Sequence, residues 1–75
     1  MKKCNVAIVG ATGAVGQAMI QILAERQFPV DNLYLLASAR SAGIQIEFEG
    51  RTIVIEDLAT FDFSQVQIGL FSAGG

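Results

Sequence analysis

The 75-residue sequence contains no histidine, no tryptophan and only one cysteine. One thiol cannot form an internal disulfide, and without histidine no Cys/His zinc site can be assembled. Five Lys and Arg against seven Asp and Glu leave the chain without the excess positive charge that general nucleic-acid binding requires. No apolar stretch reaches the roughly 18 residues of a membrane span, and the run at 6–9 is too short for a signal-peptide core. We therefore expect a reduced, soluble, cytoplasmic chain without nucleic-acid or membrane partners.

Apolar residues make up 52% of this short chain. A domain of this size buries only about 60% of the surface that its unfolded chain exposes, so its net stability is small. The sequence ends in LFSAGG at 70–75, a strand-like run followed by a turn. These features predict that residues 1–75 are the first part of something longer.

The spacing of apolar residues predicts a strand, a helix and a second strand in the first half of the chain. Residues 4–9 form a nearly continuous apolar run that ends at Gly10, as in a strand buried on both faces. A helix is expected over 14–27, ending near Phe28 because Pro29 cannot continue it. Residues 31–32 read as a turn, and 33–37 as a second buried strand. This order predicts two parallel strands joined by a right-handed crossover. The apolar face expected for the helix consists of Val15, Met19, Ile22 and Leu23.

After residue 43 the sequence alternates between apolar and polar residues, which predicts a half-buried hairpin. A turn at Glu49-Gly50 satisfies both strands in one register. In that register Ile46 faces Ile53 and Ile44 faces Ile55.

The last third of the sequence predicts a polar connection and one more strand. Residues 57–64 form the connection, with Phe61 and Phe63 expected in the core, and 67–71 read as a last buried strand. Together these elements predict an α/β protein, a partial Rossmann-type dinucleotide-binding fold whose mostly parallel sheet is accompanied by an antiparallel hairpin.

A glycine-rich loop joins the first strand to the helix, with Gly10, Gly13 and Gly16 spaced as G-x-x-G-x-x-G. Gly10 suits the sharp corner, Gly13 lets the backbone approach a diphosphate, and Gly16 lets the helix pack closely against the strand. The context of strand, loop and helix is the one that a dinucleotide fingerprint requires. No Gly-Lys-Ser/Thr follows, so a Walker P-loop is excluded. A tight turn with nothing bound is the alternative.

The first turn of the predicted helix offers hydrogen-bond donors to a pyrophosphate. The backbone amides of Gly13, Ala14 and Val15 lack intrahelical acceptors, and the helix dipole adds positive charge there. The Thr12 hydroxyl could cap the helix or bind a phosphate oxygen; the sequence is compatible with both.

The residues after the second strand indicate which dinucleotide is bound. NAD-specific folds place an acidic residue about 20 positions beyond the glycine loop, where it binds the ribose hydroxyls. Here that region contains no acid between Asp31 and Glu47. It contains Arg40 flanked by Ser38 and Ser41 instead, which favours the 2′-phosphate of NADP. The alternative is a solvated surface arginine.

Two further features lie near the two ends of the sequence. Ser72, Ala73 and Gly74 follow the last strand and would border the cofactor site if that strand lies on the other side of the first strand from the second. An ordinary glycine-rich strand exit is an equal alternative. Cys4 is expected to be a buried structural thiol, because it begins a strand at the end opposite the glycine loop and no histidine can activate it.

Three segments give the chain a specific resemblance: VAIVGATGAVGQAM at 6–19, ERQFPVDNLYLLASARSAG at 25–43 and LFSAGG at 70–75. The chain closely resembles the amino-terminal portion of the bacterial aspartate-semialdehyde dehydrogenase family. That resemblance implies an NADPH-dependent oxidoreductase that reduces aspartyl phosphate to aspartate semialdehyde through a cysteine thioester. The family serves the synthesis of lysine (through diaminopimelate), methionine and threonine, and its members are typically homodimers.

The resemblance also assigns cofactor contacts to residues of this chain. It places Thr12, Gly13, Ala14 and Val15 at the pyrophosphate. It places Arg40 and Ser41, with Ser38 nearby, at the 2′-phosphate, and it places Ser72, Ala73 and Gly74 beside the ribose near the nicotinamide. Residues 1–75 are then the amino-terminal part of an NADP-binding domain, without the catalytic and dimerisation domain.

The family's nucleophilic cysteine, its histidine base and its substrate-binding arginines lie beyond residue 75. The chain is therefore expected to contain no catalytic residue and no metal ligand, and to be inactive alone. Three alternatives stay open: a non-catalytic NADP-binding or redox-sensor module, an N-acetyl-glutamyl-phosphate reductase-like enzyme, and an extended short-chain reductase. The second fits the SARS and SAGG segments less well. The third requires a Tyr-x-x-x-Lys pair, and position 38, four residues after Tyr34, is serine.

Overall fold

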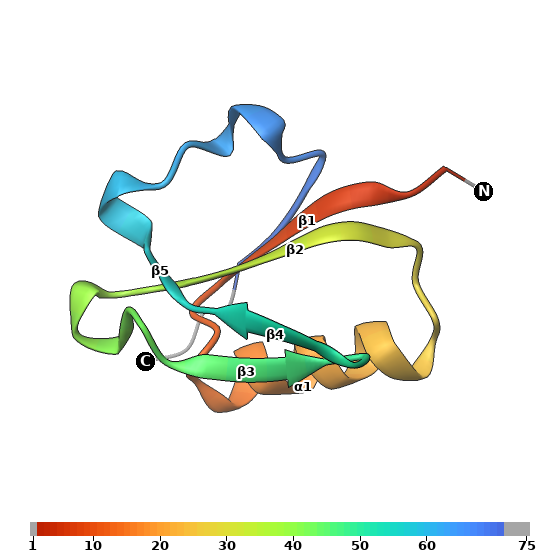
Figure 1. Ribbon diagram of the computed structural model, residues 1–75, viewed down its shortest axis with the longest axis horizontal. Helices are drawn as coiled ribbons and strands as arrows, with labels where there is room; N and C mark the ends of the chain where they lie inside the picture. Colours follow the sequence, from red (N-terminus) through yellow and green to blue (C-terminus); the bar gives the residue numbers. More distant parts are fainter. Residues whose placement is uncertain (1, 72–75) are drawn as a thin grey trace.

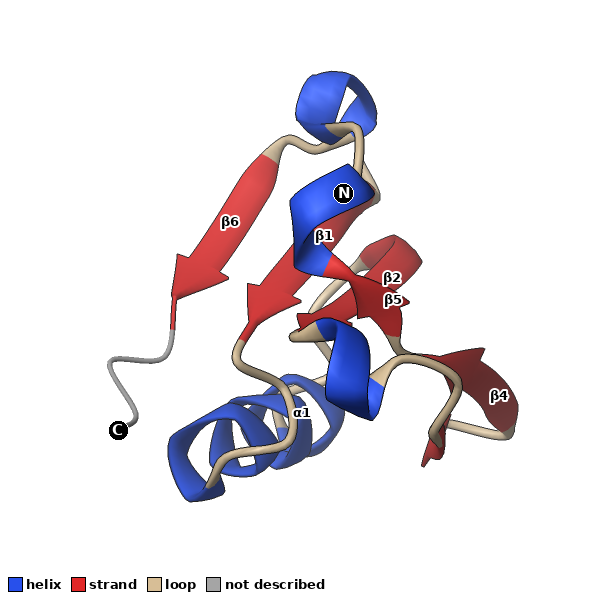
Figure 2. Ribbon diagram, turned by 90° about the vertical axis from the view of Figure 1, so that its left-hand side faces the viewer, coloured by secondary structure: helices blue, strands red, loops and turns tan. Residues whose placement is uncertain are grey.

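The computed structural model describes residues 2–71, which form one α-helix and two sheets (Figure 1). A parallel sheet has the strand order β5-β2-β1-β6, and a separate antiparallel hairpin pairs β3 with β4. Figure 2 shows the strands of the parallel sheet side by side, with the helix along one face. No helix formed by residues 2–71 is long and apolar enough to cross a membrane. The elements are β1 (Cys4–Val9), α1 (Ala14–Glu25), β2 (Val30–Ala37), β3 (Gln45–Phe48), β4 (Arg51–Val54), β5 (Glu56–Asp57) and β6 (Ile68–Phe71), with 3₁₀ turns η1 (Ala39–Ser41), η2 (Leu58–Thr60) and η3 (Phe63–Gln65).

The parallel sheet confirms the predicted fold class and sets three strand ends level with one another. Val9, the last residue of β1, pairs with Leu36 of β2 on one side and with Phe71 of β6 on the other. The chain therefore leaves β1, β2 and β6 at one common edge of the sheet. Two expectations were wrong: β5 was not predicted, and β2 begins at Val30 because residues 31–32 are strand, not turn.

The core lies between α1, the hairpin and one face of the parallel sheet. Its members are buried aliphatic side chains of the sheet, two residues of α1, the last residue of β3 and the residue that follows β4. They include Val6, Ile8, Leu33, Leu35, Ile20, Leu23, Phe48 and Ile55.

The predicted apolar face of α1 is correct at two of its four positions, because Leu23 is buried and the partly buried Met19 packs against the core. Val15 and Ile22 were expected inside but are 48% and 50% exposed. The buried positions are Gly16, Ile20 and Leu23, spaced i, i+4 and i+7. Gly16 has no side chain and so did not contribute to the apolar pattern. The predicted apolar face was therefore centred about one residue away from the face that is buried.

The hairpin has the predicted register. Ile46 pairs with Ile53, and the N–H of Ile55 donates to the carbonyl of Ile44 at 2.8 Å. The turn residues Glu49 and Gly50 have φ values of 47° and 79°. Positive φ at both central residues is typical of the type I′ turn, whose twist matches that of the flanking strands.

We expect the substitution Glu49→Asn to stabilise the protein by about 0.5–1 kcal/mol, because asparagine tolerates positive φ better than glutamate. The measurement is the midpoint of urea unfolding. Glu47→Asn, which removes the same charge from β3, is the control and is expected to be neutral or destabilising. A lower midpoint for Glu49→Asn than for the control would contradict the prediction.

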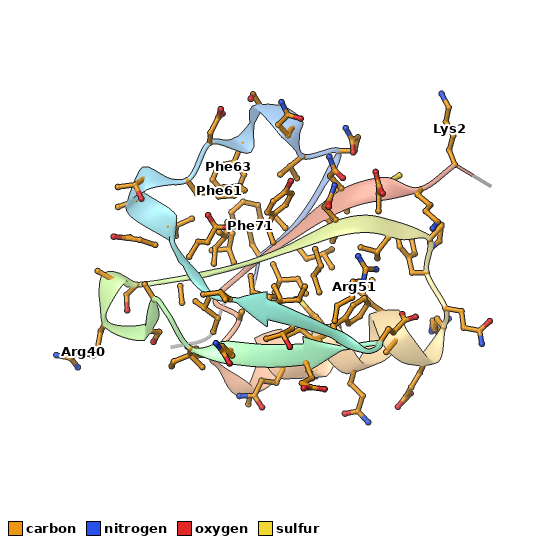
Figure 3. The ribbon with its side chains drawn as sticks, viewed as in Figure 1. Lys2, Arg40, Arg51, Phe61, Phe63 and Phe71 are labelled. Atoms are coloured by element: carbon orange, nitrogen blue, oxygen red, sulfur yellow. The ribbon has the colours of Figure 1, made fainter. Side chains whose placement is uncertain are left out.

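The second face of the parallel sheet carries aromatic side chains. Phe61 is half-buried and lies against Tyr34, with ring centroids 5.1 Å apart, and Phe63 meets Phe61 edge to face. Figure 3 shows Phe61, Phe63 and Phe71 in the same region. Phe63 is 38% exposed and so is not in the core as predicted, and Phe71 is 66% exposed. The predicted last strand is present, but the prediction that it is buried was wrong: its residues are half-buried or exposed, because β6 lies at the end of the strand order within the part of the chain that is described.

Candidate functional site

The glycine loop follows β1 at the common carboxyl edge of the sheet. Gly10 has a φ of 83°, a left-handed conformation that glycine adopts without strain. The N–H groups of Gly10 and Ala11 both donate to the carbonyl of Leu36, at 2.9 and 3.1 Å. Ala11 is fully buried. The loop is therefore fixed to the end of β2 as well as to β1.

Gly16 sets how closely α1 approaches that loop. A Cβ atom on Gly16 would lie 2.2 Å from the carbonyl oxygen of Gly10 and 2.8 Å from the Cα of Ala11. Both neighbours are backbone atoms that cannot rotate away. The predicted role of Gly16 in close packing is thus present, but the backbone that it contacts is the loop rather than the strand.

The start of α1 differs in detail from the predicted set of donors. The N–H of Gly13 donates to the carbonyl of Gly10 at 3.1 Å, so this amide is already used within the loop. Gly13 is the N-cap residue, so Thr12, one position earlier, does not cap the helix. The Thr12 side chain is exposed. The amides of Ala14 and Val15 belong to the first turn, which has no intrahelical acceptors for them. No acidic residue stands in that turn to repel a phosphate.

The predicted 2′-phosphate residues lie in and beside η1, directly after β2. Ser38 precedes the turn, Arg40 lies within it, and the N–H of Ser41 donates to the carbonyl of Ser38 at 2.9 Å. Ser38 and Arg40 are exposed and Ser41 is half-buried. Figure 3 shows Arg40 extending away from the body of the protein. The structure therefore brings this segment and the glycine loop to one sheet edge, while the Arg40 guanidinium stands free of the loop in solvent.

The prediction for Ser72, Ala73 and Gly74 lies outside the described residues. Its structural condition is nevertheless met, because β6 pairs with β1 on the side opposite β2. The connection from β1 leads to β2 on one side, while β6 joins on the other, so the strand order reverses at β1. Open α/β sheets bind ligands at the carboxyl ends of their strands at such a reversal.

The structure adds an acidic residue that sequence spacing did not indicate. Asp57 ends β5 and pairs with Ala37, the last residue of β2. Its Oδ1 accepts a hydrogen bond from the N–H of Ala59 at 2.9 Å. Asp62 makes the same contact with the N–H of Ser64, and the hydrogen bonds from Ser64, the backbone one first, lower the pKa of the Asp62 carboxyl. Only the pairing of β5 with β2 reveals that Asp57 lies at the candidate site.

The molecule has two further hollows, one at the opposite end of the sheet from the glycine loop and one that extends from the loop along α1. A cavity of about 380 Å³ at the amino ends of the strands is lined in part by Cys4, which is half-buried rather than buried as predicted. A larger, mostly apolar hollow of about 560 Å³ lies between α1 and the hairpin and reaches Thr12 at one end. Among residues 2–71 there is no cluster of Cys, Asp and Glu that could hold a metal ion.

Comparison with known proteins decides the family. Residues 5–75 match the family model described as "Semialdehyde dehydrogenase, NAD binding domain". The chain belongs to this family. The chain is therefore part of a nucleotide-cofactor-binding domain of the semialdehyde dehydrogenases.

Individual members of the family are similar over nearly the whole chain. An aspartate-semialdehyde dehydrogenase of Vibrio mimicus is 59% identical over 71 residues, which are 95% of this chain and 22% of that protein. A USG-1 protein homolog of Azotobacter vinelandii is 51% identical over 93% of this chain and 21% of its own length. The crystal structure of aspartate semialdehyde dehydrogenase II from Vibrio cholerae, complexed with ASA, gives a TM-score of 0.94 at 56% identity, over 96% of this chain and 24% of that one. The chain thus spans about a fifth to a quarter of these relatives.

Proposed function

We propose that residues 1–75 are the amino-terminal part of an NADP(H)-binding domain in an aspartate-semialdehyde dehydrogenase. The single observation that carries this proposal is the meeting of the start of α1 and the Arg40 segment at the edge where the strand order reverses. The similarity to named aspartate-semialdehyde dehydrogenases supports the choice of activity.

Two segments of the chain bind two different parts of the cofactor. The amides of Ala14 and Val15 and the Thr12 hydroxyl bind the pyrophosphate, aided by the positive end of the α1 dipole. Ser38, Arg40 and Ser41 bind the 2′-phosphate, because a guanidinium forms charge-assisted hydrogen bonds with phosphate oxygens. Gly13 serves by letting the backbone approach the diphosphate, since its own amide is occupied. Ser72, Ala73 and Gly74 complete the site toward the nicotinamide ribose. When bound, the cofactor supplies a hydride for reducing an acyl phosphate to an aldehyde.

The remaining properties of the parent protein follow from the same proposal. The parent is a cytoplasmic homodimer that acts on aspartyl phosphate, and its catalytic residues lie outside these 75. The test is an NMR titration of the chain with NADP and with NAD. Amide shifts concentrated at 10–16 and 38–41 support the proposal, and an absence of such shifts with a folded spectrum contradicts it.

Arg40→Ala should weaken NADP binding by about 1.5–3 kcal/mol, roughly ten- to hundredfold, and leave NAD binding almost unchanged. The 2′-phosphate alone distinguishes the two cofactors, so only its partner should separate their affinities. The measurement is a pair of dissociation constants by calorimetry. Arg26→Ala removes the same charge at the other end of α1 and is the control for general electrostatic attraction. Equal losses for both cofactors in Arg40→Ala would rule out the assignment.

The purified chain is expected to show no NADPH oxidation with aspartyl phosphate. It contains no histidine, and Cys4 begins β1 at the end opposite the glycine loop. The measurement is the absorbance of NADPH over time. Turnover above the rate without protein would show that the chain contains catalytic residues after all.

A second candidate function is an NADP-binding module without dehydrogenase activity. The observation that favours it is the 51% identity to a USG-1 protein homolog, a name that states no enzymatic activity. The two functions predict the same cofactor binding by these 75 residues. They differ in the full-length parent, where only the dehydrogenase oxidises NADPH with aspartyl phosphate.

A further inference from the structure

Strand β3 forms the outer side of the hairpin. Arg51 of β4 donates a hydrogen bond to the carbonyl of Asp31 at 2.8 Å, so the β4 side of the hairpin faces β2. Figure 1 shows β4 between β3 and β2 in that view, with β3 running along α1. Within residues 2–71 the sheet order gives β3 no neighbouring strand besides β4. One edge of β3 is therefore unpaired in this part of the chain.

The hydrogen bonds of the hairpin decide which backbone groups point to the unpaired edge. The N–H of Ile55 donates to the carbonyl of Ile44, and hydrogen-bonded pairs recur at every second residue of an antiparallel ladder. Gln45 and Glu47 fall between these pairs, so their N–H and C=O groups point away from β4. Among residues 2–71, no backbone group outside the hairpin is bonded to either residue. The edge thus offers two donors and two acceptors to an added strand.

An apolar groove runs beside this edge. It is the hollow of about 560 Å³ that has α1 on one side and β3 on the other. Its lining includes the buried side chains of Ile20 and Phe48 and the half-buried Ala24 and Ile46. Because side chains alternate between the two faces of a sheet, every second side chain of a strand added to β3 would point into this groove.

The charge at the groove is of one sign. Glu47 and Glu49 line it and are exposed, and its lining among residues 2–71 includes no lysine or arginine. The Glu47 side chain lies on the outer face of the hairpin, opposite to the face that carries Ile46. Cross-strand neighbours on that face are stabilised by opposite charges and destabilised by like charges. An added strand with basic residues on its outer face therefore complements β3.

We propose that the unpaired edge of β3 is a docking site for an extended basic segment of another protein, which adds a strand to the hairpin. The backbone groups of Gln45 and Glu47 bind its main chain, and its apolar side chains enter the groove beside α1. Its lysine or arginine side chains face Glu47 and Glu49. A second copy of this chain fits less well, because pairing two β3 strands would bring both glutamates of each copy to one face.

The test is an NMR titration of the isotope-labelled 75-residue chain with a blocked synthetic peptide, Val-Lys-Val-Lys-Val. The largest amide shifts are expected at 44–49 and at 17–24, the two sides of the groove. A peptide with glutamate in place of lysine should bind about tenfold or more weakly, because its charges repel Glu47 and Glu49. A peptide methylated at both lysine amides keeps the charges but loses the donors that face β3, and it should lose affinity to a similar degree, about tenfold.

Glu47→Lys is expected to reverse the preference, so that the glutamate peptide binds more tightly than the lysine peptide. Glu56→Lys makes the same change of charge in β5, outside the lining of the groove, and is the matched control. It should keep the wild-type preference. An unchanged preference in Glu47→Lys, with an amide spectrum that shows a folded protein, overturns the docking site.

The same peptides are then titrated against the full-length parent, with fluorescence anisotropy of the labelled peptide as the readout. The same order of affinities is expected there, and this measurement decides alone if the isolated chain is unfolded. A parent that binds none of the peptides shows that its own chain covers the edge, which overturns the proposal. Equal affinity for the methylated and unmethylated peptides overturns strand addition, and concentration-dependent dimers with the same shifts at 44–49 show that a second copy is the occupant instead.

Discussion

Gly16→Ala is expected to abolish measurable cofactor binding and to lower the free energy of unfolding by about 3 kcal/mol. The added methyl group would lie 2.2 Å from the Gly10 carbonyl oxygen, a distance that no pair of these atoms can maintain. Relief requires α1 or the loop to move. The loop is held by the two hydrogen bonds to the Leu36 carbonyl, and Ala11 within it is fully buried. Movement therefore costs stability, and it displaces the Ala14 and Val15 amides from the pyrophosphate position.

Gly69→Ala is the matched control for Gly16→Ala, because it makes the same chemical change within β6. There the new Cβ would lie 3.3 Å from an atom of the Phe71 ring, and that side chain is exposed and can shift. We expect a change in stability of less than about 0.5 kcal/mol and unaltered cofactor affinity. The measurements are urea unfolding and NADP titration of both variants. Equal effects of the two substitutions would show that the close approach at Gly16 is not what shapes the site.

Local sequence patterns were sufficient to predict β1, the hairpin and the glycine loop. The continuous apolar run at 4–9 predicted β1, and alternation around Glu49-Gly50 predicted the hairpin, because these signals act over a few residues. The glycine spacing predicted the loop for the same reason. The close approach of α1 to that loop also follows from a single position, Gly16.

What sequence patterns could not supply depends on tertiary contacts. The inward face of α1 is selected by the contact at Gly16, which has no side chain to contribute to a hydrophobic pattern. Strand β5 has only two residues, too few for a sequence pattern, and it is defined as a strand by its pairing with β2. Asp57 lies at the carboxyl ends of the strands because it pairs with Ala37, which is 20 positions away in the sequence. The exposure of Phe63 and Phe71 likewise depends on which elements cover the second face of the sheet, and a run of apolar residues in the sequence does not determine that.

Phe48→Ala is expected to destabilise the protein by about 3–5 kcal/mol. Phe48 is 2% exposed and is the largest fully buried side chain described. The Arg51 guanidinium lies 5.7 Å from its ring centroid and donates to the carbonyl of Asp31 at 2.8 Å. Figure 3 shows Arg51 between the hairpin and the rest of the protein. Removing the ring leaves a cavity in the core and frees the residue that ties the hairpin to the start of β2.

The size of this loss matters because a 75-residue domain has a total stability of only about 4–11 kcal/mol. The Phe48→Ala protein is therefore expected to lose a large fraction of its free energy of unfolding, which is measured as a lower midpoint of urea unfolding together with the dispersion of the amide NMR spectrum. Phe63→Ala removes the same ring from a side chain that is 38% exposed, and should cost less than about 1.5 kcal/mol. Equal losses in the two variants would contradict the role of Phe48.

The hairpin also connects the Arg40 segment to β5, so its loosening should reach the cofactor site. Phe48 anchors β3, and the chain passes from β4 through Ile55 into β5 and Asp57. Because NADP binds only the folded state, saturating NADP should restore part of the lost stability, by about 2.7 kcal/mol at a hundredfold excess over the dissociation constant. The same concentration of NAD should restore less, since the Arg40 segment adds affinity only for the 2′-phosphate. Equal recovery with NAD and NADP would contradict the prediction, because it would show that the folded variant does not distinguish the 2′-phosphate.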